Sequence, residues 1–135
     1  MRKDITIPDV QGVFMAAVQE WNDDFMQNVW NVYLVNENNE PLSNIMVVSK
    51  AFGTVEGEMR KTSMLRHAFI EIGPQAAHKV EMIEDSVLAL NNEFMVTFFI
   101  GKTLYDRKFI FRANLLNPEN MEEIPVLNKP GVMVR

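Results

Sequence analysis

The 135-residue chain has the length of one domain, which is enough to enclose a hydrophobic core without disulfides or a structural metal. It contains no cysteine, so disulfides, zinc–thiolate sites, iron–sulfur clusters and cysteine nucleophiles are excluded. The formal net charge of −5 argues against a DNA-binding protein, since such proteins usually carry a basic excess that neutralises phosphates.

The N-terminus predicts a cytoplasmic protein. Met1-Arg2-Lys3 is basic, but the segment Asp4 to Asp9 follows where a signal peptide has its apolar stretch. The longest apolar run, Val13 to Val18, is far shorter than the ~20 residues of a membrane-spanning helix. We therefore expect no membrane contact.

Short apolar runs between turn residues predict β-strands along most of the chain. Asn36 to Pro41 predicts a turn, because Asn tolerates positive φ and Pro cannot continue a ladder. Gly101 lies in a three-residue loop that predicts a hairpin between the last two strands. In chain order, the predicted strands are 13–20, 29–35, 45–52, 62–72, 77–84, 94–100 and 104–112.

Three segments differ from this pattern. Residues 20–28 could form a short helix with a narrow apolar face, and residues 86–90 could form a single helical turn. Residues 117–135 hold three of the six prolines and predict an extended C-terminal arm of the single 1–135 domain. Within the arm, 124–127 and 131–134 could still pair along a sheet edge.

Short strands without intervening helices indicate an all-β fold of antiparallel sheets. A single sheet cannot cover both faces of strands this apolar, so a two-sheet sandwich of immunoglobulin-like topology is the leading prediction. A small β-barrel is the alternative. The Cys–Trp–Cys hallmark of immunoglobulin domains is missing, so this topology rests on the number of strands alone.

One segment, residues 60–67, concentrates basic and hydroxyl side chains and predicts a site for a small anionic ligand. Arg and Lys with Ser or Thr donors can hold a phosphate or a carboxylate. Neighbouring side chains of a strand point to opposite faces, so Arg66 and His67 can face one ligand only if a bulge lies between them. The alternative is an edge strand that its charges protect from aggregation. The candidate ligand-binding residues are Arg60, Lys61, Ser63, Arg66 and His67.

No motif predicts a catalytic, metal or cofactor site. Gly53 and Gly57 are too close together for a phosphate-binding loop, and Lys61 follows too late. His67 and His78, the two histidines, lack the spacing of a metal-binding pair. Pairs of adjacent acidic residues do not place carboxylates across a cleft. The sequence therefore favours a protein that is not an enzyme and has no cofactor.

The predicted strand 94–100 is apolar on both faces. Phe94, Val96 and Phe98 would point to one side, and Met95 and Phe99 to the other. Such strands are usually covered on both faces, but an exposed apolar face also marks protein contacts. The ten methionines would make such a surface adaptable. This pattern predicts a protein-interaction module that binds a partner or a second copy as a homodimer.

Five segments of the chain look familiar together: residues 46–50, 62–67, 90–94, 104–108 and 131–134. With them the chain resembles, over nearly its full length, a family of small uncharacterised bacterial proteins, some of which are labelled phenylalanine–tRNA synthetase α subunit. The resemblance implies a bacterial origin, but it carries no catalytic residues. A class II synthetase catalytic domain is a larger sheet flanked by helices, with arginine-bearing motifs that hold ATP, and this chain has neither the length nor the helices.

Three functions therefore stand as hypotheses. The first is a non-enzymatic interaction module. The second is a binder of a small anionic ligand, or an enzyme acting on one, that uses residues 60–67. The third is an RNA-associated accessory protein, for which salt-dependent binding to tRNA would be the signature.

Overall fold

The computed structural model describes residues 11–135, which form two antiparallel β-sheets and two short 3-10 turns. The N-terminal segment from which the cytoplasmic location was predicted, Met1 to Asp9, lies outside the described residues. The elements are β1 (Val13–Asn22), β2 (Gln27–Asn36), β3 (Leu42–Val55), β4 (Glu58–Lys61), β5 (Leu65–Ile72), β6 (Ala76–Ile83), η1 (Asp85–Val87), β7 (Asn91–Ile100), β8 (Thr103–Phe111), η2 (Pro118–Asn120), β9 (Glu122–Ile124) and β10 (Lys129–Val134).

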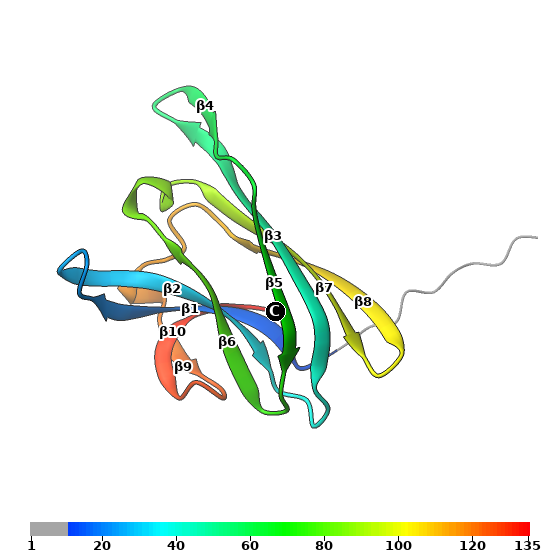
Figure 1. Ribbon diagram of the computed structural model, residues 1–135. Helices are drawn as coiled ribbons and strands as arrows, with labels where there is room; N and C mark the ends of the chain where they lie inside the picture. The colour runs from blue at the N-terminus through cyan, green and yellow to red at the C-terminus, as the bar shows by residue number, and fades with distance from the viewer. Residues whose placement is uncertain (1–10) are drawn as a thin grey trace, which may run out of the picture.

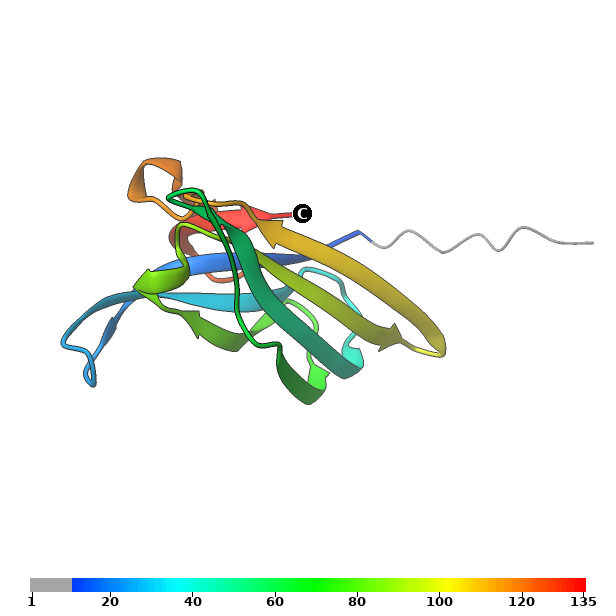
Figure 2. The ribbon, with the colours of Figure 1, turned by 90° about the horizontal axis from the view of Figure 1, so that it is seen from above.

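The two sheets form two layers, as Figures 1 and 2 show from directions at right angles. Sheet A has the strand order β6-β2-β1-β10-β9. Sheet B has the order β4-β3-β7-β8, and β5 also pairs with β3, on the edge of β3 that faces away from β7. The chain passes between the layers four times, at β2–β3, β5–β6, β6–β7 and β8–β9. Strands β5 and β6 are edge strands of different sheets.

Both sheets contribute their inner faces to one core. Met15, Val32 and Leu34 from sheet A are fully buried, as are Val96 and Phe98 from sheet B. Phe94 and Phe111 meet edge to face within this core, with ring centroids 5.9 Å apart. The sequence prediction of an all-β, antiparallel two-sheet sandwich is confirmed, and the sheets do not close into the barrel that was the alternative.

β3 is longer than the predicted strand 45–52 because it pairs with two successive partners. Its first part pairs with β5 and its last part pairs with β4. Asn44 has a φ of 47°, and the register with β7 shifts between Ser43 and Met46, which marks a bulge at this position. The predicted strand 62–72 is observed as β5 and begins only at Leu65, because residues 62–64 connect β4 to β5; β4 itself was not predicted.

Residues 20–28 form a hairpin and not the short helix that the sequence allowed. β1 continues to Asn22, and Asn22 Oδ1 accepts hydrogen bonds from the backbone N–H groups of Asp24 and Phe25, at 2.8 and 3.1 Å. An Asn side chain that closes a turn in this way competes with helix formation. Met26 then has a φ of 54°, which a continuing helix would not permit. The helical turn expected within 86–90 is observed as η1, beginning slightly earlier.

The C-terminal segment 117–135 is built into sheet A. β10 lies between β1 and β9, and its residues Gly131 to Val134 pair with Val18 to Met15. Ile124 on β9 is fully buried and belongs to the core. Within residues 11–135, neither short helical turn has the length and apolar character needed to span a membrane.

Candidate functional site

The five residues predicted to bind an anion are distributed over several surfaces. Arg60 and Lys61 lie on β4 beside a surface hollow, and Arg60 is 4.0 Å from Glu58. Ser63 lines a different cavity. Arg66 pairs with Val48 and points outward, whereas His67 pairs with the fully buried Val47 and points inward. No bulge separates these two neighbours, and His67 does not line the cavity that Ser63 lines, so the five residues do not form one site.

His67 belongs to a polar cluster that joins the two sheets. Ser49 Oγ on β3 donates a hydrogen bond of 2.6 Å to Glu81 Oε1 on β6. The Nε2–H of His67 donates to the same oxygen at 2.8 Å. Ser49 is buried, and Glu81 and His67 are largely buried. This cluster therefore closes the open side of the sandwich, where sheet A ends at β6 and sheet B ends at β5.

The order of the groups in this cluster determines its chemistry. A Ser–His–acid triad places the imidazole between the hydroxyl and the carboxylate, so that the imidazole takes the hydroxyl proton. Here the Glu81 carboxylate lies in the middle and accepts from both Ser49 and His67. No hydrogen bond joins the imidazole to the hydroxyl. The arrangement holds two edge strands together and does not activate Ser49 as a nucleophile.

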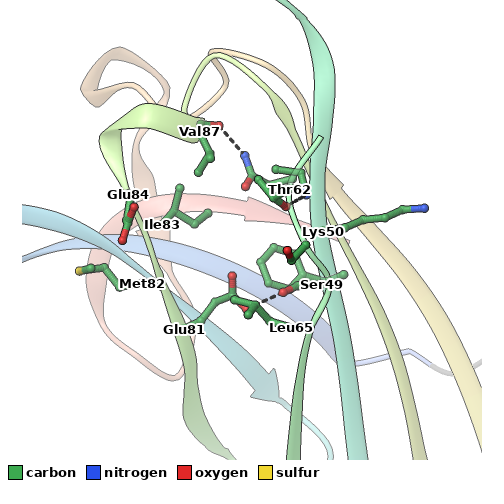
Figure 3. Close-up of a pocket in the computed structure, with 13 residues that line it drawn as sticks. Ser49, Lys50, Thr62, Leu65, Glu81, Met82, Ile83, Glu84 and Val87 are labelled. Carbon is green, nitrogen blue, oxygen red and sulfur yellow. Dashed lines mark hydrogen bonds between the residues drawn. The ribbon is translucent and has the colours of Figure 1, made fainter. Parts of the chain in front are cut away.

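A cavity of about 260 Å³ opens beside this cluster (Figure 3). Glu81 and Glu84 contribute carboxylates to its lining, and Ser49, Thr62 and Ser63 contribute hydroxyls. Lys50, the cationic residue of this lining, extends away from the cavity in Figure 3 toward Glu93, 3.7 Å from its carboxylate. The hydroxyl of Thr62 accepts a 2.9 Å bond from the backbone N–H of Ala51. The charges facing this cavity are therefore acidic, which disfavours an anionic occupant.

Replacing Glu81 by alanine is expected to lower the free energy of unfolding by about 1–3 kcal/mol, because Ser49 and His67 then lose their shared acceptor. Ser49→Ala, which removes one neutral donor, should cost only about 1 kcal/mol. Urea unfolding followed by circular dichroism measures both. Glu58→Ala on the exposed Arg60 pair is the control and should change stability by less than about 0.5 kcal/mol. Equal losses in all three variants would contradict this role.

A second polar cluster lies on the face of sheet A that is turned away from sheet B. Glu20 Oε1 accepts hydrogen bonds from Asn31 Nδ2 and Tyr33 Oη at 2.8 and 2.7 Å, and its Oε2 lies 2.6 Å from Lys129 Nζ. Partial burial would raise the pKa of Glu20, but the bonds from Lys129, Asn31 and Tyr33 outweigh it and hold that pKa below 4.5. Burial, with the adjacent carboxylate, raises the pKa of Tyr33 to about 12.

These two shifts predict a loss of stability at both ends of the pH range. The lowered pKa of Glu20 stabilises the fold above pH 4.5 and this contribution is lost as the pH falls through the folded-state value. The raised pKa of Tyr33 makes the fold lose stability as the pH rises from 10 to about 12. Urea midpoints against pH for the wild type, Glu20→Gln and Tyr33→Phe test this. Glu20→Gln should flatten the acid limb and Tyr33→Phe the alkaline one; unchanged limbs would contradict the assignment.

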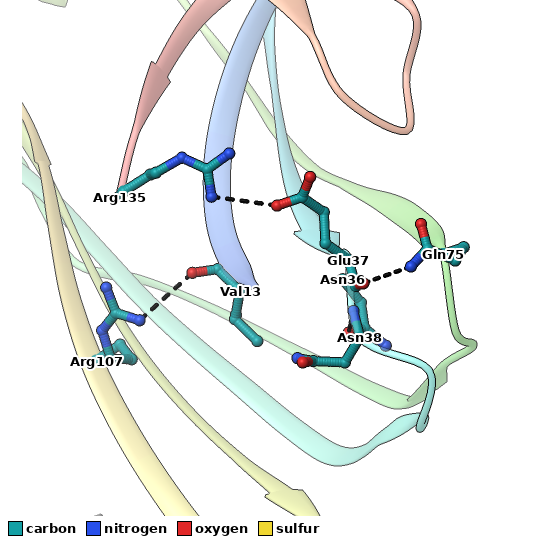
Figure 4. A network of polar contacts seen from close by, with 7 residues as sticks. All are labelled: Val13, Asn36, Glu37, Asn38, Gln75, Arg107 and Arg135. Atoms are coloured by element: carbon teal, nitrogen blue, oxygen red, sulfur yellow. Dashed lines mark hydrogen bonds and ion pairs between the residues drawn. The ribbon is translucent and has the colours of Figure 1, made fainter. Parts of the chain in front are cut away.

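The two chain ends of sheet A are joined by a third set of contacts (Figure 4). Arg135 donates to Glu37 at 3.1 Å and its guanidinium lies 4.4 Å from the centroid of the Phe14 ring. Arg107 donates to the backbone carbonyl of Val13 at 3.4 Å, and Gln75 donates to the backbone carbonyl of Glu37. These contacts hold the C-terminus and β8 against the start of β1, which is a structural role.

The outer face of sheet B carries a group of exposed apolar side chains. The register of the strands aligns their outward side chains in rows across the sheet. Met46 pairs with Ala68 and Thr97, and Met95 pairs with Val48 and Lys108. Met46, Met95 and Leu104 are each about half exposed, and Ile70 is 86% exposed. The polar Thr97 lies opposite Met46 on this face. The apolar residues of the outer face of sheet B are Met46, Val48, Ala68, Ile70, Met95, Phe99, Leu104 and Ile110.

Charged residues border this face. Glu93 is buried to 7% exposure between Lys50 and Lys108, each with its Nζ 3.7 Å from the carboxylate. Arg66 and Asp106 lie at its other margins. The sequence pointed to this surface through Met95 and Phe99, which face away from the core. It did not point to Met46, Ile70 or Leu104, whose common face depends on the pairing of β5, β3 and β8.

Comparison with known proteins gave no match to a family model, a curated protein or a solved structure. Among residues 11–135, no group of three or more His, Asp or Glu side chains is placed to hold a metal ion.

Proposed function

We propose that the protein is a non-enzymatic protein-interaction module and that its contact surface is the outer face of sheet B. The observation that carries this proposal is the continuity of the exposed apolar side chains. Ile70, Met46, Met95 and Leu104 lie on β5, β3, β7 and β8, so the apolar surface crosses the sheet from one edge to the other. Single exposed apolar residues are ordinary, but a contiguous patch with a charged border marks a site of protein contact.

The residue types on this face also suit a protein partner. Methionine side chains are unbranched and polarizable, so Met46 and Met95 can adapt to the shape of another protein. The bordering Lys50, Glu93 and Lys108 can fix the orientation of a partner, since peripheral charges contribute more to specificity than to affinity. The polar cluster of Ser49, His67 and Glu81 supports the non-enzymatic part of the proposal, because its hydrogen bonds are made within the fold.

Photo-crosslinking from the outer face of sheet B tests this function. p-Benzoylphenylalanine in place of Met95 is expected to give covalent adducts with protein, either with a second copy in the purified sample or with another chain in an extract of the source cells. The same label in place of Lys79, an exposed strand residue of sheet A, is the control and should give few adducts. Absence of any protein adduct from position 95, or equal yields from both positions, would contradict the proposal.

The other interpretations of the sequence stay predictions. They comprise immunoglobulin-like topology, bacterial origin, cytoplasmic location, the anion site at 60–67 and the association with tRNA. A thermal-shift screen with phosphates, nucleotides and carboxylates tests the anion site, and salt-dependent binding to tRNA tests the last.

A further inference from the structure

We infer that the chain also forms a homodimer, in which two copies join through the free edge of β8 in an antiparallel register centred on Arg107. This inference goes beyond the proposed function, because the contact is the edge of sheet B and the outer face stays open to a partner. In such a dimer the two B sheets become one continuous sheet, and the outer faces of both copies form one surface.

The free edge of β8 carries the first part of the argument. Among the described strands, β8 pairs with β7 alone, and it is the last strand of sheet B. Gly101 and Lys102 alone connect β7 to β8, so the closing pair Ile100–Thr103 is a hydrogen-bonded pair. Hydrogen-bonded and non-hydrogen-bonded pairs then alternate along the hairpin. The backbone groups of Leu104, Asp106, Lys108 and Ile110 therefore point to the free edge.

The side chains of β8 are complementary to themselves in one register. If Arg107 of one copy lies opposite Arg107 of the other, Asp106 lies opposite Lys108 and Leu104 lies opposite Ile110. Each of these pairs occurs twice, because the two strands are antiparallel and identical. They lie on the outer face of sheet B, where opposite charges and apolar residues in direct cross-strand contact are favourable. The same four residues supply the backbone groups that the new ladder needs.

Neighbouring registers lack this match. A shift of the centre to Asp106 or to Lys108 places two identical charges opposite each other on the outer face and also loses both Asp106–Lys108 pairs. Asp106 has no hydrogen-bond or ion-pair partner within residues 11–135, whereas Lys108 already lies near Glu93. Edge strands are often protected by charges that repel a second copy. Here the opposite charges of Asp106 and Lys108, two positions apart, favour the register centred on Arg107.

This register also places Arg107 of both copies opposite each other on the inner side of sheet B, a like-charge pair that the existing contacts of Arg107 relieve. Its guanidinium lies 4.8 Å from the centroid of the Phe109 ring and donates to the Val13 carbonyl, so its charge is drawn toward sheet A. On the same inner side, Tyr105 lies opposite Phe109 of the second copy, an aromatic cross-strand pair. At the two-fold axis, residue 107 of one copy lies directly opposite residue 107 of the other. The two residues form a non-hydrogen-bonded pair, with Cα atoms ~4.5 Å apart.

Engineered cysteines test the register, because the chain contains no other cysteine. Arg107→Cys is expected to form a disulfide-linked dimer under mild oxidation, since the two Cα atoms lie within the reach of a disulfide. Asp106→Cys is the matched control. Its two copies are diagonal neighbours ~7–8 Å apart, so it should cross-link poorly although it is more exposed. Should Arg107→Cys fail to fold, a mixture of Asp106→Cys and Lys108→Cys should give the mixed disulfide.

Sedimentation velocity on the unmodified chain provides the second readout. The wild type is expected to sediment as a concentration-dependent dimer, and Asp106→Lys should weaken dimerisation by about tenfold, because two attractive pairs become repulsive. Asp106→Lys with Lys108→Glu should restore much of the loss. A monomer at every concentration up to the solubility limit, faster cross-linking at 106 than at 107, or a dimer insensitive to Asp106→Lys would overturn the inference. Adducts from position 95 with a different protein would leave the proposed function standing.

Discussion

Phe98→Ala is expected to lower the free energy of unfolding by about 3–5 kcal/mol, the range found when phenylalanine is removed from a packed core. Phe98 is fully buried and stacks on Tyr105, with ring centroids 5.6 Å apart. Its removal leaves a cavity between the sheets, which the strands cannot close because their hydrogen-bonded ladders fix the spacing. A loss of this size is a large fraction of the stability of a single domain, which is ~5–15 kcal/mol.

Chemical denaturation of Phe98→Ala and of Phe25→Ala measures this effect. Phe25→Ala is the control, since Phe25 lies in the β1–β2 turn with half of its surface exposed. It should change stability by less than about 0.5 kcal/mol. If Phe98→Ala were tolerated as well as Phe25→Ala, the two sheets would not pack as described.

Gly131→Ala is expected to destabilise the fold by about 1–3 kcal/mol, although alanine is the smallest possible addition. A Cβ at this position would lie 2.6 Å from the backbone carbonyl oxygen of Ala17 and 2.8 Å from a methyl group of Val18. The side chain of Ile124 lies 3.1 Å from the same point. The backbone of β1 cannot withdraw without breaking its pairing with β2, so the strain falls on the β1–β10 ladder.

Gly73→Ala is the matched control for this substitution. Nothing lies within 4 Å of a Cβ at Gly73, and its φ is outside the left-handed region. We expect Gly73→Ala to be neutral or slightly stabilising, because alanine restricts the unfolded chain. Thermal melting of both variants decides the matter. Equal melting temperatures would mean that β10 does not approach β1 as closely as the structure shows.

Side-chain alternation predicted a strand well where one face of that strand packs against the core. Trp30, Val32 and Leu34 alternate with residues of the opposite face, and β2 is observed at that place. The two-sheet sandwich followed from strands too apolar for a single layer. The C-terminal segment was harder, because its prolines suggested an arm. Pro130 pairs with Glu123 on the short strand β9, while β10 pairs with β1 through residues 131–134.

The contacts that define the polar cluster could not be predicted from local pattern. Ser49 and Glu81 are 32 positions apart and belong to different sheets, so their 2.6 Å bond depends on how the layers meet. The anion site was predicted from neighbours in sequence, and strand geometry sends Arg66 and His67 to opposite faces. The sequence predicted only part of the outer face of sheet B, namely Met95 and Phe99. Its extent depends on which strands adjoin β7.

The most direct test of this surface uses the methionines, whose methyl groups give separate NMR signals when labelled with ¹³C. As the protein is concentrated, the Met95 signal should shift, whereas the signals of the fully buried Met15 and of Met59, 90% exposed on β4, should not. That result would place protein contact on the outer face of sheet B. A shift at Met59 with an unchanged Met95 would contradict the account and assign the contact to the β3–β4 hairpin.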